Sequence, residues 1–491
     1  MPRPLILAVA QFAPAKADVP TNRDRIAALL ADALAMRPRP QVLHLPETAL
    51  TGYFVEGGVR ELAASAGSVA EELQARFVAL APPGATLDVV IGFYETYRST
   101  LHNSAMYVTL GGNAPVIRHV HRKLFLPTYG LFDEARFVEA GHELTTFETS
   151  WGRAAMLVCE DAWHSLTGTI AALQGAEVVF ISSAAPARGT WPRGDGVPGP
   201  ASVARWERLV RDIAEEHGVV VSLANLVGSE GGKMFSGGSM IVGPAGDVRL
   251  RLPIFTPAIG GAHLDLRDLV RVRADMPLLA DLAASLPTLH RQLGETIAPR
   301  PRPTGAAWDA ADPQPAAPPR GEGAGDAAAH GARAPREAPG VVVIPPTPTP
   351  GGAPPSLDID PALVERWLVQ FVRDEVRRRG FEHAVVGLSG GVDSAVTTYL
   401  AAKALGPERV IALRMPYRTS SPDSLAHAQL VIDALGIRHR TMEITAAVDG
   451  YLQHEPDADA ARRGNVMARL RMITLFDLSA KHRAVPLGTG N

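Results

Sequence analysis

The chain has 491 residues, of which 46% are hydrophobic and 20% are charged, and its formal net charge is −3. This length allows two or three domains with ample core, and the composition is that of a globular protein. The small net charge gives no electrostatic basis for binding nucleic acid or an anionic membrane. A single cysteine, Cys159, excludes an intrachain disulfide and a cysteine zinc cluster, and it suits a cytoplasmic location.

The N-terminal residues are expected to form a first β-strand and not a secretory signal. The apolar run Leu5–Ala10 is too short for the core of a signal peptide, and Gln11 interrupts it. No apolar run in the chain approaches the roughly twenty residues that a membrane-spanning helix needs.

Residues 1–290 alternate short β-rich runs with helical stretches, which predicts an α/β domain. The expected strands are Leu5–Phe12, Val42–Leu45, Val89–Phe93, Ser104–Leu110, Ala154–Val158, Val178–Ser182 and Val219–Ala224. The expected helices are Arg23–Met36, Val69–Ala81 and Val203–Glu216.

Three chemically reactive side chains stand just past predicted strands of this region. Glu47 follows one apolar run, Lys123 follows another, and Cys159 follows a third. Open α/β layers gather catalytic groups at such strand ends. A thiol must lose its proton to attack a carbonyl, a carboxylate can take that proton, and an ammonium can lower the thiol pKa and stabilise an oxyanion.

Residues 296–356 have a different composition, because 38 of these 61 residues are Pro, Gly or Ala. Such a segment cannot bury enough apolar area to offset its ordering entropy. We therefore expect a disordered, partly extended linker here.

Residues 357–491 return to a β–α rhythm, which predicts a Rossmann-like parallel-sheet nucleotide domain. The expected helices are Pro361–Arg379, Ala395–Leu405, Asp423–Leu435 and Asp459–His482, and the expected strands are Ala384–Leu388, Val410–Leu413, His439–Met442 and Ala484–Leu487.

The most informative motif of the chain, GLSGGVDS, occupies residues 387–394 between a predicted strand and a predicted helix. Glycines let backbone amides close on an anion, and the helix dipole adds positive potential there. A carboxylate in such a loop repels phosphate unless it holds Mg²⁺ between them. The residues that we expect to bind ATP are Gly387, Leu388, Ser389, Gly390, Gly391, Val392, Asp393 and Ser394, and Asp393 is the expected metal ligand.

The motif is not the Walker form, because no Gly-Lys-Ser/Thr follows. It resembles the SGGxDS loop of the ATP pyrophosphatases of the adenine-nucleotide alpha-hydrolase superfamily. That resemblance implies cleavage of ATP between its α and β phosphates and adenylation of a carbonyl oxygen.

The contexts LPETALTGY, HRKLFLPTYGLFDE and AAMLVCEDAWH resemble the nitrilase or carbon–nitrogen hydrolase family, whose fold is an α-β-β-α sandwich. The resemblance implies that Glu47 is the base, Lys123 the oxyanion stabiliser, Cys159 the nucleophile and Glu134 a supporting glutamate. It also implies a glutamine-binding set, namely Tyr53, Tyr129, Glu160, Ser183 and Arg188.

A nitrilase-type amidase followed by such a loop resembles the glutamine-dependent NAD⁺ synthetases. The resemblance implies ATP and Mg²⁺ as cofactors, glutamine and deamido-NAD⁺ as substrates, and homo-oligomers formed through the nitrilase-like domain. It places Arg469 at deamido-NAD⁺ and Thr489 at ATP. It also implies that such enzymes continue past Asn491 with a second acidic metal ligand, so we expect a shortened synthetase domain.

Alternative readings differ in their ammonia source or in the role of the second half. GMP synthetases use a Cys-His-Glu glutaminase, asparagine synthetases use an N-terminal cysteine where this chain has Pro2, and thiolating relatives usually need more than one cysteine. A stand-alone amidase with a remnant or regulatory nucleotide module stays open. A scaffold role is weaker, because both sets of reactive residues are intact.

Overall fold

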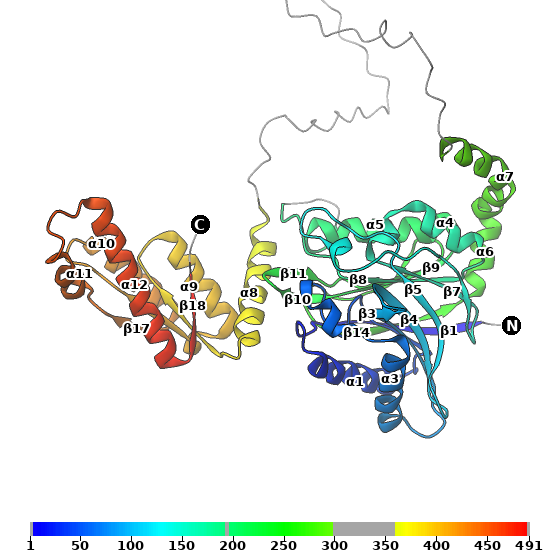
Figure 1. The fold of residues 1–491 in the computed structure, drawn as a ribbon, viewed down its shortest axis with the longest axis horizontal. Coiled ribbons are helices and arrows are strands. Elements are labelled where there is room, and N and C mark those ends of the chain that lie inside the picture. The colour runs from blue at the N-terminus through cyan, green and yellow to red at the C-terminus, as the bar shows by residue number, and fades with distance from the viewer. Residues whose placement is uncertain (1–2, 192–195, 298–358, 489–491) are drawn as a thin grey trace, which may run out of the picture. The chain divides into compact units, whose positions relative to one another are not determined.

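The computed structural model describes residues 3–191, 196–297 and 359–488 (Figure 1). The linker prediction, from residue 298 onward, and the prediction for Thr489 lie outside the described residues. Among the helices that are described, none is both long and apolar enough to cross a membrane.

The first sheet of the N-terminal part has six strands in the order β14-β1-β2-β3-β4-β5. Their bounds are β1 Pro4–Gln11, β2 Val42–His44, β3 Leu87–Tyr97, β4 Thr100–Leu110, β5 Val116–Arg122 and β14 Ala258–Asp265. Helices α1 (Val19–Ala35) and α3 (Ala66–Leu80) bury apolar residues at helical spacing, such as Ile26 with Leu30 and Leu73 with Phe77, against this sheet. Asp18 starts α1 by accepting a hydrogen bond from the amide of Thr21 at 3.1 Å.

The second sheet also has six strands, in the order β13-β12-β9-β8-β7-β6. Their bounds are β6 Phe147–Glu148, β7 Arg153–Val158, β8 Val178–Ser183, β9 Val220–Asn225, β12 Met240–Val242 and β13 Val248–Arg251. Helices α4 (Ser165–Leu173) and α5 (Ala201–His217) lie along its side of the sandwich, opposite α1 and α3 (Figure 1). The strands β7, β8 and β9 are parallel and buried on both faces, so their sequences are continuous apolar runs.

The apolar side chains between the two sheets form one core, to which both sheets contribute. Leu7 and Tyr107 come from the first sheet, and Met156 and Phe180 come from the second. The predicted α-β-β-α sandwich is therefore confirmed. The remaining N-terminal elements are α2 Val59–Leu62, β10 Val227–Glu230, β11 Lys233–Ser236, α6 Arg267–Asp275, α7 Leu278–Ile297 and the 3₁₀ turns Glu56–Gly58, Glu134–Arg136 and Cys159–Trp163.

The C-terminal part contains a four-stranded parallel sheet in the order β17-β16-β15-β18. Its elements are α8 Pro361–Arg378, β15 His383–Gly387, α9 Val392–Leu405, β16 Val410–Arg414, α10 Pro422–Leu435, β17 Arg438–Thr441, α11 Thr445–Leu452, α12 Ala460–His482 and β18 Ala484–Leu487, with a 3₁₀ turn at Pro407–Arg409. Val386 faces a core shared with α9 and α10, whereas its neighbour Val385 faces one shared with α12. The predicted parallel-sheet domain is confirmed over the described residues.

Two hairpins differ from the sequence-based expectation. The expected strands at 89–93 and 104–110 are longer in the structure and form a hairpin that reaches Tyr97 and Thr100. The prediction ended these strands early because it followed apolar residues, whereas the outer part of the hairpin pairs polar residues such as Glu95 and His102. The hairpin of β10 and β11 was not predicted, although Gly231 and Gly232, both with positive φ, mark its turn.

Candidate functional site

The structure brings the three predicted reactive residues into one buried group. Glu47, Lys123 and Cys159 follow β2, β5 and β7 at corresponding strand ends. The ammonium Nζ of Lys123 lies 3.0 Å from Oε1 of Glu47, and both charged groups act on the pKa of Cys159. The juxtaposition that the strand ends predicted is therefore present.

Lys123 is held between two carboxylates in the interior of the protein. Its Nζ lies 2.7 Å from Oε2 of Glu134, in addition to its contact with Glu47. The side-chain amide of Asn103 donates to the same two carboxylates, at 2.7 Å to Glu47. Burial lowers the pKa of Lys123, but Glu134 and Glu47 outweigh it and hold that pKa well above its usual value, so the side chain is an ammonium.

Glu47 has one free oxygen within this group. Oε1 accepts from Lys123 and Asn103, whereas Oε2 is buried without a hydrogen-bond partner in the described part of the chain. Burial raises the pKa of Glu47, although the charge of Lys123 opposes this rise. A buried carboxylate oxygen with no partner is an available proton acceptor.

Cys159 begins the tight turn after β7 with a φ of 45°, a left-handed conformation that is uncommon for a residue other than glycine. Its sulfur lies 3.5 Å from the hydroxyl oxygen of Ser183. Burial and then Glu47 raise the pKa of the thiol well above its usual value, and the lowering effect of Lys123 is smaller. The ammonium of Lys123 lowers the thiol pKa as expected, but burial has the larger effect, so deprotonation of the thiol requires a base.

Gly92 in β3 makes room for Glu47. A Cβ atom at Gly92 would lie 2.5 Å from Cα of Glu47 and 2.7 Å from the carbonyl oxygen of Pro46. The amide of Ala49 also donates to the carbonyl of Gly92 at 2.8 Å. A glycine inside a strand often marks such a close backbone approach.

The predicted glutamine-binding residues lie around this group. The hydroxyl of Tyr129 donates to Glu160, with oxygens at 2.9 and 3.0 Å, and burial together with Glu160 raises the pKa of Tyr129 to about 12. Arg188 is exposed, and its guanidinium lies beside Gly130. Tyr53 instead is buried, and its hydroxyl donates to Oε2 of Glu134 at 3.1 Å.

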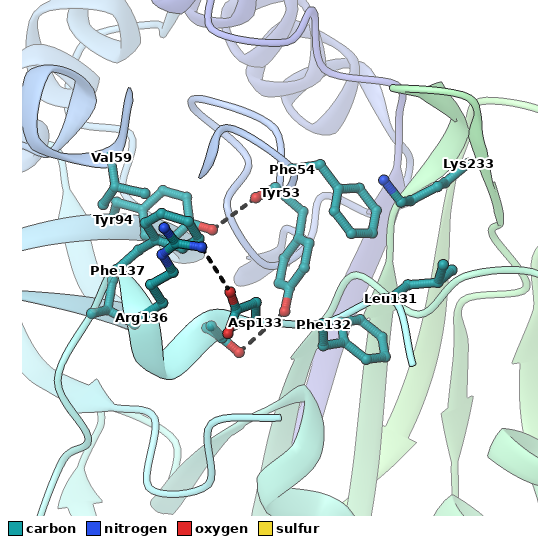
Figure 2. A pocket seen from close by; sticks show the side chains of 12 residues that line it. Tyr53, Phe54, Val59, Tyr94, Leu131, Phe132, Asp133, Arg136, Phe137 and Lys233 are labelled. Carbon is teal, nitrogen blue, oxygen red and sulfur yellow. Dashed lines mark hydrogen bonds and ion pairs between the residues drawn. The ribbon is translucent and has the colours of Figure 1, made fainter. Parts of the chain in front are cut away.

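A cavity of about 280 Å³ adjoins Glu134 and Tyr53. Figure 2 shows Tyr53, Phe54 and Phe132 together in its wall, where the rings of Tyr53 and Phe54 are 5.0 Å apart. The hydroxyl of Tyr94 donates to the carbonyl of Tyr53 at 2.8 Å and fixes this segment (Figure 2).

The second predicted site is the glycine-rich loop between β15 and α9. Gly390 has a φ of 87°, and a Cβ there would lie 2.1 Å from the carbonyl oxygen of Ser424. Inside the loop, the hydroxyl of Ser389 accepts from the amide of Gly391 at 3.3 Å, and the two serine hydroxyls, Ser389 and Ser394, lie 3.1 Å apart. Asp393 is exposed in the first turn of α9, the end at which a helix attracts anions.

Two cavities of the C-terminal part are lined by residues of the predicted nucleotide site. One of about 270 Å³ is lined by Gly387, Leu388 and Ser389 of the loop and also by Arg414 and Arg471. The other, of about 610 Å³, is lined by Arg469, the predicted deamido-NAD⁺ residue, and by residues of α11. Arg471 was not predicted, although it lies two positions after Arg469 in the same helix.

The glycine-rich loop offers Mg²⁺ one carboxylate, that of Asp393. Among the described residues, no group of three or more Asp, Glu, His or Cys side chains could hold a metal ion. Mg²⁺ in nucleotide sites is usually held by one or two carboxylates together with substrate phosphates and water. The exposed carboxylate of Asp393, in the first turn of α9 directly after the glycine-rich loop, fits such a shared site.

Sequence reasoning missed three residues of the nitrilase-like site. Asn103 bridges the two carboxylates, Gly92 admits the loop of Glu47, and Asp161 is a buried carboxylate two residues after Cys159. The signals were present as a glycine and an asparagine in or beside predicted strands, but their roles depend on neighbours distant in the chain.

Two stacked sheets between layers of helices define an α-β-β-α sandwich, and comparison with known proteins assigns its family. Residues 6–274, more than half of the chain, match the sequence model of the family described as Carbon-nitrogen hydrolase, so the chain belongs to the carbon–nitrogen hydrolase family. Residues 364–491 match a second family, described as NAD synthase. Both predicted resemblances are confirmed.

Two curated relatives match the C-terminal part. The NH(3)-dependent NAD(+) synthetase of Chlorobaculum parvum is 54% identical over 138 residues, which are 28% of this chain and 50% of that protein. The same-named protein of Fusobacterium nucleatum is 49% identical over 135 residues and 52% of its length. The chain thus spans about half the length of the curated relatives that it matches.

Two solved structures match nearly the whole chain. The glutamine-dependent NAD+ synthetase of Acinetobacter baumannii, in complex with ADP, has a TM-score of 0.70 at 21% identity, over 99% of this chain and 75% of that one. The glutamine-dependent NAD(+) synthetase of Cytophaga hutchinsonii has a TM-score of 0.64 at 15% identity with the same coverage. At such identities the likeness shows the fold, with a nitrilase-like part followed by a parallel-sheet part.

Proposed function

We propose that the chain is the glutaminase and part of the synthetase of a glutamine-dependent NAD⁺ synthetase. The observation that carries the proposal is the buried group of Glu47, Lys123, Glu134 and Cys159 in a chain that also carries the SGGVDS loop. The proposed domains are residues 1–290 for the glutaminase and 357–491 for the synthetase part, and the two family matches support this division.

In the glutaminase half, the sulfur of Cys159 attacks the side-chain amide carbon of glutamine. Glu47 takes the thiol proton on its free Oε2 and returns it to the departing nitrogen, which leaves as ammonia. Water, deprotonated by Glu47, then hydrolyses the γ-glutamyl thioester and restores the thiol. The ammonium of Lys123, anchored by Glu134, stabilises the oxyanion of each step.

Residues around the buried catalytic group bind glutamine in this proposal. Tyr129 and Glu160, which are already hydrogen-bonded to each other, lie at the entrance, and the carboxylate can receive the amino group of the substrate. Arg188 suits the α-carboxylate, and Ser183 lies beside the nucleophile. Tyr53 acts through Glu134, which its buried hydroxyl orients by a hydrogen bond.

In the synthetase half, the loop amides and serine hydroxyls cradle the phosphates of ATP, and Arg469 contacts deamido-NAD⁺. Mg²⁺, held by Asp393 and the phosphates, would supply charge neutralisation for the pyrophosphate that departs. The nicotinate carboxylate attacks the α-phosphorus, and ammonia then displaces AMP to give NAD⁺. We also propose, from the sequence alone, that Thr489 contacts ATP.

The remaining parts of the proposal concern the setting of the enzyme. The lone cysteine and the small net charge support a cytoplasmic enzyme that acts on small molecules. Homo-oligomerisation through the nitrilase-like part is also proposed. A stand-alone amidase with a remnant or regulatory nucleotide module is the second candidate, and the intact SGGVDS loop disfavours a remnant.

The test is to supply the purified protein with glutamine, deamido-NAD⁺ and Mg·ATP, and to measure glutamate, AMP and NAD⁺ for the wild type and for Cys159→Ala. We expect the variant to lose glutamine hydrolysis by at least about a thousandfold and to remain folded, because a small side chain is removed. Hydrolysis at the wild-type rate by the variant would refute the assigned nucleophile. Hydrolysis of glutamine by the wild type with no AMP and no NAD⁺ formed would favour the second candidate.

A further inference from the structure

The carboxylate of Asp161 joins the two segments that carry the ammonium and the thiol. Asp161 belongs to the 3₁₀ turn that begins at Cys159, and its side chain is fully buried. Its Oδ1 accepts from the amides of Leu124 and Phe125 at 2.9 and 3.0 Å. Its Oδ2 accepts from the amide of Val158 at 3.0 Å and contacts Nε2 of His121 at 2.9 Å.

These four contacts lie next to the reactive residues in the chain. Leu124 directly follows Lys123, and His121 precedes it by two positions at the end of β5. Val158 directly precedes Cys159 at the end of β7. One carboxylate therefore fixes the backbone directly after the ammonium and directly before the thiol, and it also holds the side chain of His121 on the other side of Lys123.

The turn at Cys159 needs such support. Its φ of 45° is a left-handed conformation that costs roughly 1–2 kcal/mol for a residue with a Cβ. The hydroxyl of Thr167 donates to the carbonyl of Asp161 at 2.7 Å and ties the other side of the turn to α4. The turn is thus held from β5 by the side chain of Asp161 and from α4 by its backbone.

We propose that Asp161 is the positioning residue that sets the Lys123 ammonium against the Cys159 thiol, an inference that rests on the proposed glutaminase function. Asp161 contacts no substrate atom in this proposal. It acts through the backbone at residues 124, 125 and 158.

The substitution Asp161→Asn tests this role sharply. All four partners of the carboxylate are placed as donors, so the amide nitrogen of an asparagine would face N–H groups whichever way the side chain turns. The hydrogen bonds made by one of the two oxygens must therefore break, although the volume of the side chain stays the same. We expect kcat for glutamine hydrolysis to fall by about a hundredfold or more with KM changed by only a few-fold, because misplacement by about 1 Å can cost that much.

A second readout does not depend on glutamine. Cys159 is the sole cysteine of the chain, so alkylation by iodoacetamide reports on this thiol alone. The ionisable groups that act on it include Glu47, which raises its pKa, and Lys123, which lowers it. If Asp161→Asn withdraws the ammonium, the pH at which alkylation accelerates moves upward.

Asp88→Asn is the matched control. Asp88 is also a buried carboxylate, but it accepts from the hydroxyl of Tyr107 at 2.7 Å and joins β3 to β4. Its substitution lowers the unfolding temperature without moving the alkylation profile. A kcat loss and a profile shift in Asp161→Asn alone support the proposal. An unchanged profile, a shift to lower pH, or equal effects in both variants overturn it.

Two further measurements keep the result decisive. If Asp161→Asn does not fold, His121→Phe removes one of the four contacts at similar volume, and it must shift the alkylation profile in the same direction for the proposal to stand. If wild-type protein does not hydrolyse glutamine, the proposed function fails. The alkylation comparison still decides the role of Asp161 in that case.

Discussion

At the scale of single residues, the chemistry depends on which of two opposing effects is larger at each buried group. For Lys123, two carboxylates outweigh burial and keep the side chain charged. For Cys159, burial outweighs the single ammonium and keeps the thiol protonated. The resting site therefore holds a protonated nucleophile beside a carboxylate with a free oxygen, and catalysis must begin with transfer of the thiol proton.

Glu47→Gln is expected to remove the proton acceptor and leave the shape of the site nearly unchanged. Glutamine hydrolysis should fall by about a hundredfold or more, the usual contribution of a general base. Burial raises the pKa of Glu47, so the wild-type enzyme loses its base as the pH falls through that raised value. The acid limb of its kcat profile should therefore begin at a higher pH than an exposed glutamate would give. Glu160→Gln should change KM and leave that limb in place, and an acid limb that survives in Glu47→Gln contradicts the assignment.

Some residues of the site could be predicted from the sequence, whereas the roles of others become visible only in the folded structure. Glu47, Lys123 and Cys159 could be predicted because each follows an apolar run, and strand ends of an α/β layer converge. Asn103 and Asp161 could not, because a polar residue beside a strand is ordinary until its partners are known. Their partners are brought close by the β3–β4 hairpin and by the packing of β5 near β7.

At the scale of elements, glycines decide how closely segments approach. The site requires the loop after β2 to lie directly against β3, and Gly92 permits it. The boundaries of most strands and helices followed from apolar periodicity, as for β18, Ala484–Leu487, whose limits match the prediction. The β10–β11 hairpin could not be predicted from apolar periodicity. Its strand β10 contains Gly228, Ser229 and Glu230 and lacks an alternation of apolar and polar side chains.

Gly92→Ala is expected to displace Glu47, because the added methyl would meet backbone atoms at 2.5 and 2.7 Å that cannot rotate away. We expect a stability loss of roughly 1–3 kcal/mol, typical of overpacking, and a larger than tenfold loss of kcat for glutamine hydrolysis. Gly67→Ala, in α3 with open space at the Cβ position, is the control and should preserve activity and slightly stabilise the helix. Equal activities of the two variants would show that the approach of β3 to Glu47 is not required.

The phosphate loop offers a second matched pair. Gly390→Ala places an alanine in a left-handed backbone conformation, with its Cβ 2.1 Å from the carbonyl oxygen of Ser424. The loop must therefore open to relieve this clash. Gly391→Ala meets only the hydroxyl of Ser389 at 3.5 Å, an ordinary contact. Calorimetric titration with Mg·ATP should show binding weakened at least tenfold more by the first substitution than by the second. Similar affinities would mean that this loop does not hold the phosphates.

At the scale of the whole molecule, the proposed function joins two chemistries through ammonia. Ammonia that escapes into water near neutral pH is diluted and mostly protonated, which leaves little of the free base that can attack an adenylate, so the proposed function predicts a protected route between the two sites. The two halves could each be predicted from motifs, since Cys159 and Asp393 stand in recognisable contexts. Their coupling could not, because no local pattern encodes a path between residues distant in the chain.

The coupling can be tested with two inactive variants in the protein as it exists with both halves. Cys159→Ala removes glutamine hydrolysis and should still form NAD⁺ from added ammonium salt. Asp393→Ala should hydrolyse glutamine but form no NAD⁺ from glutamine or from ammonium, because the metal ion that neutralises the triphosphate loses its carboxylate ligand. A mixture of the two variants, supplied with glutamine alone, measures how much ammonia crosses through solvent. We expect the mixture to form NAD⁺ at less than about a tenth of the wild-type rate per active site, since a route protected from water raises the local concentration of ammonia. Full activity of the mixture would show that ammonia passes freely through solution and that no protected route is needed.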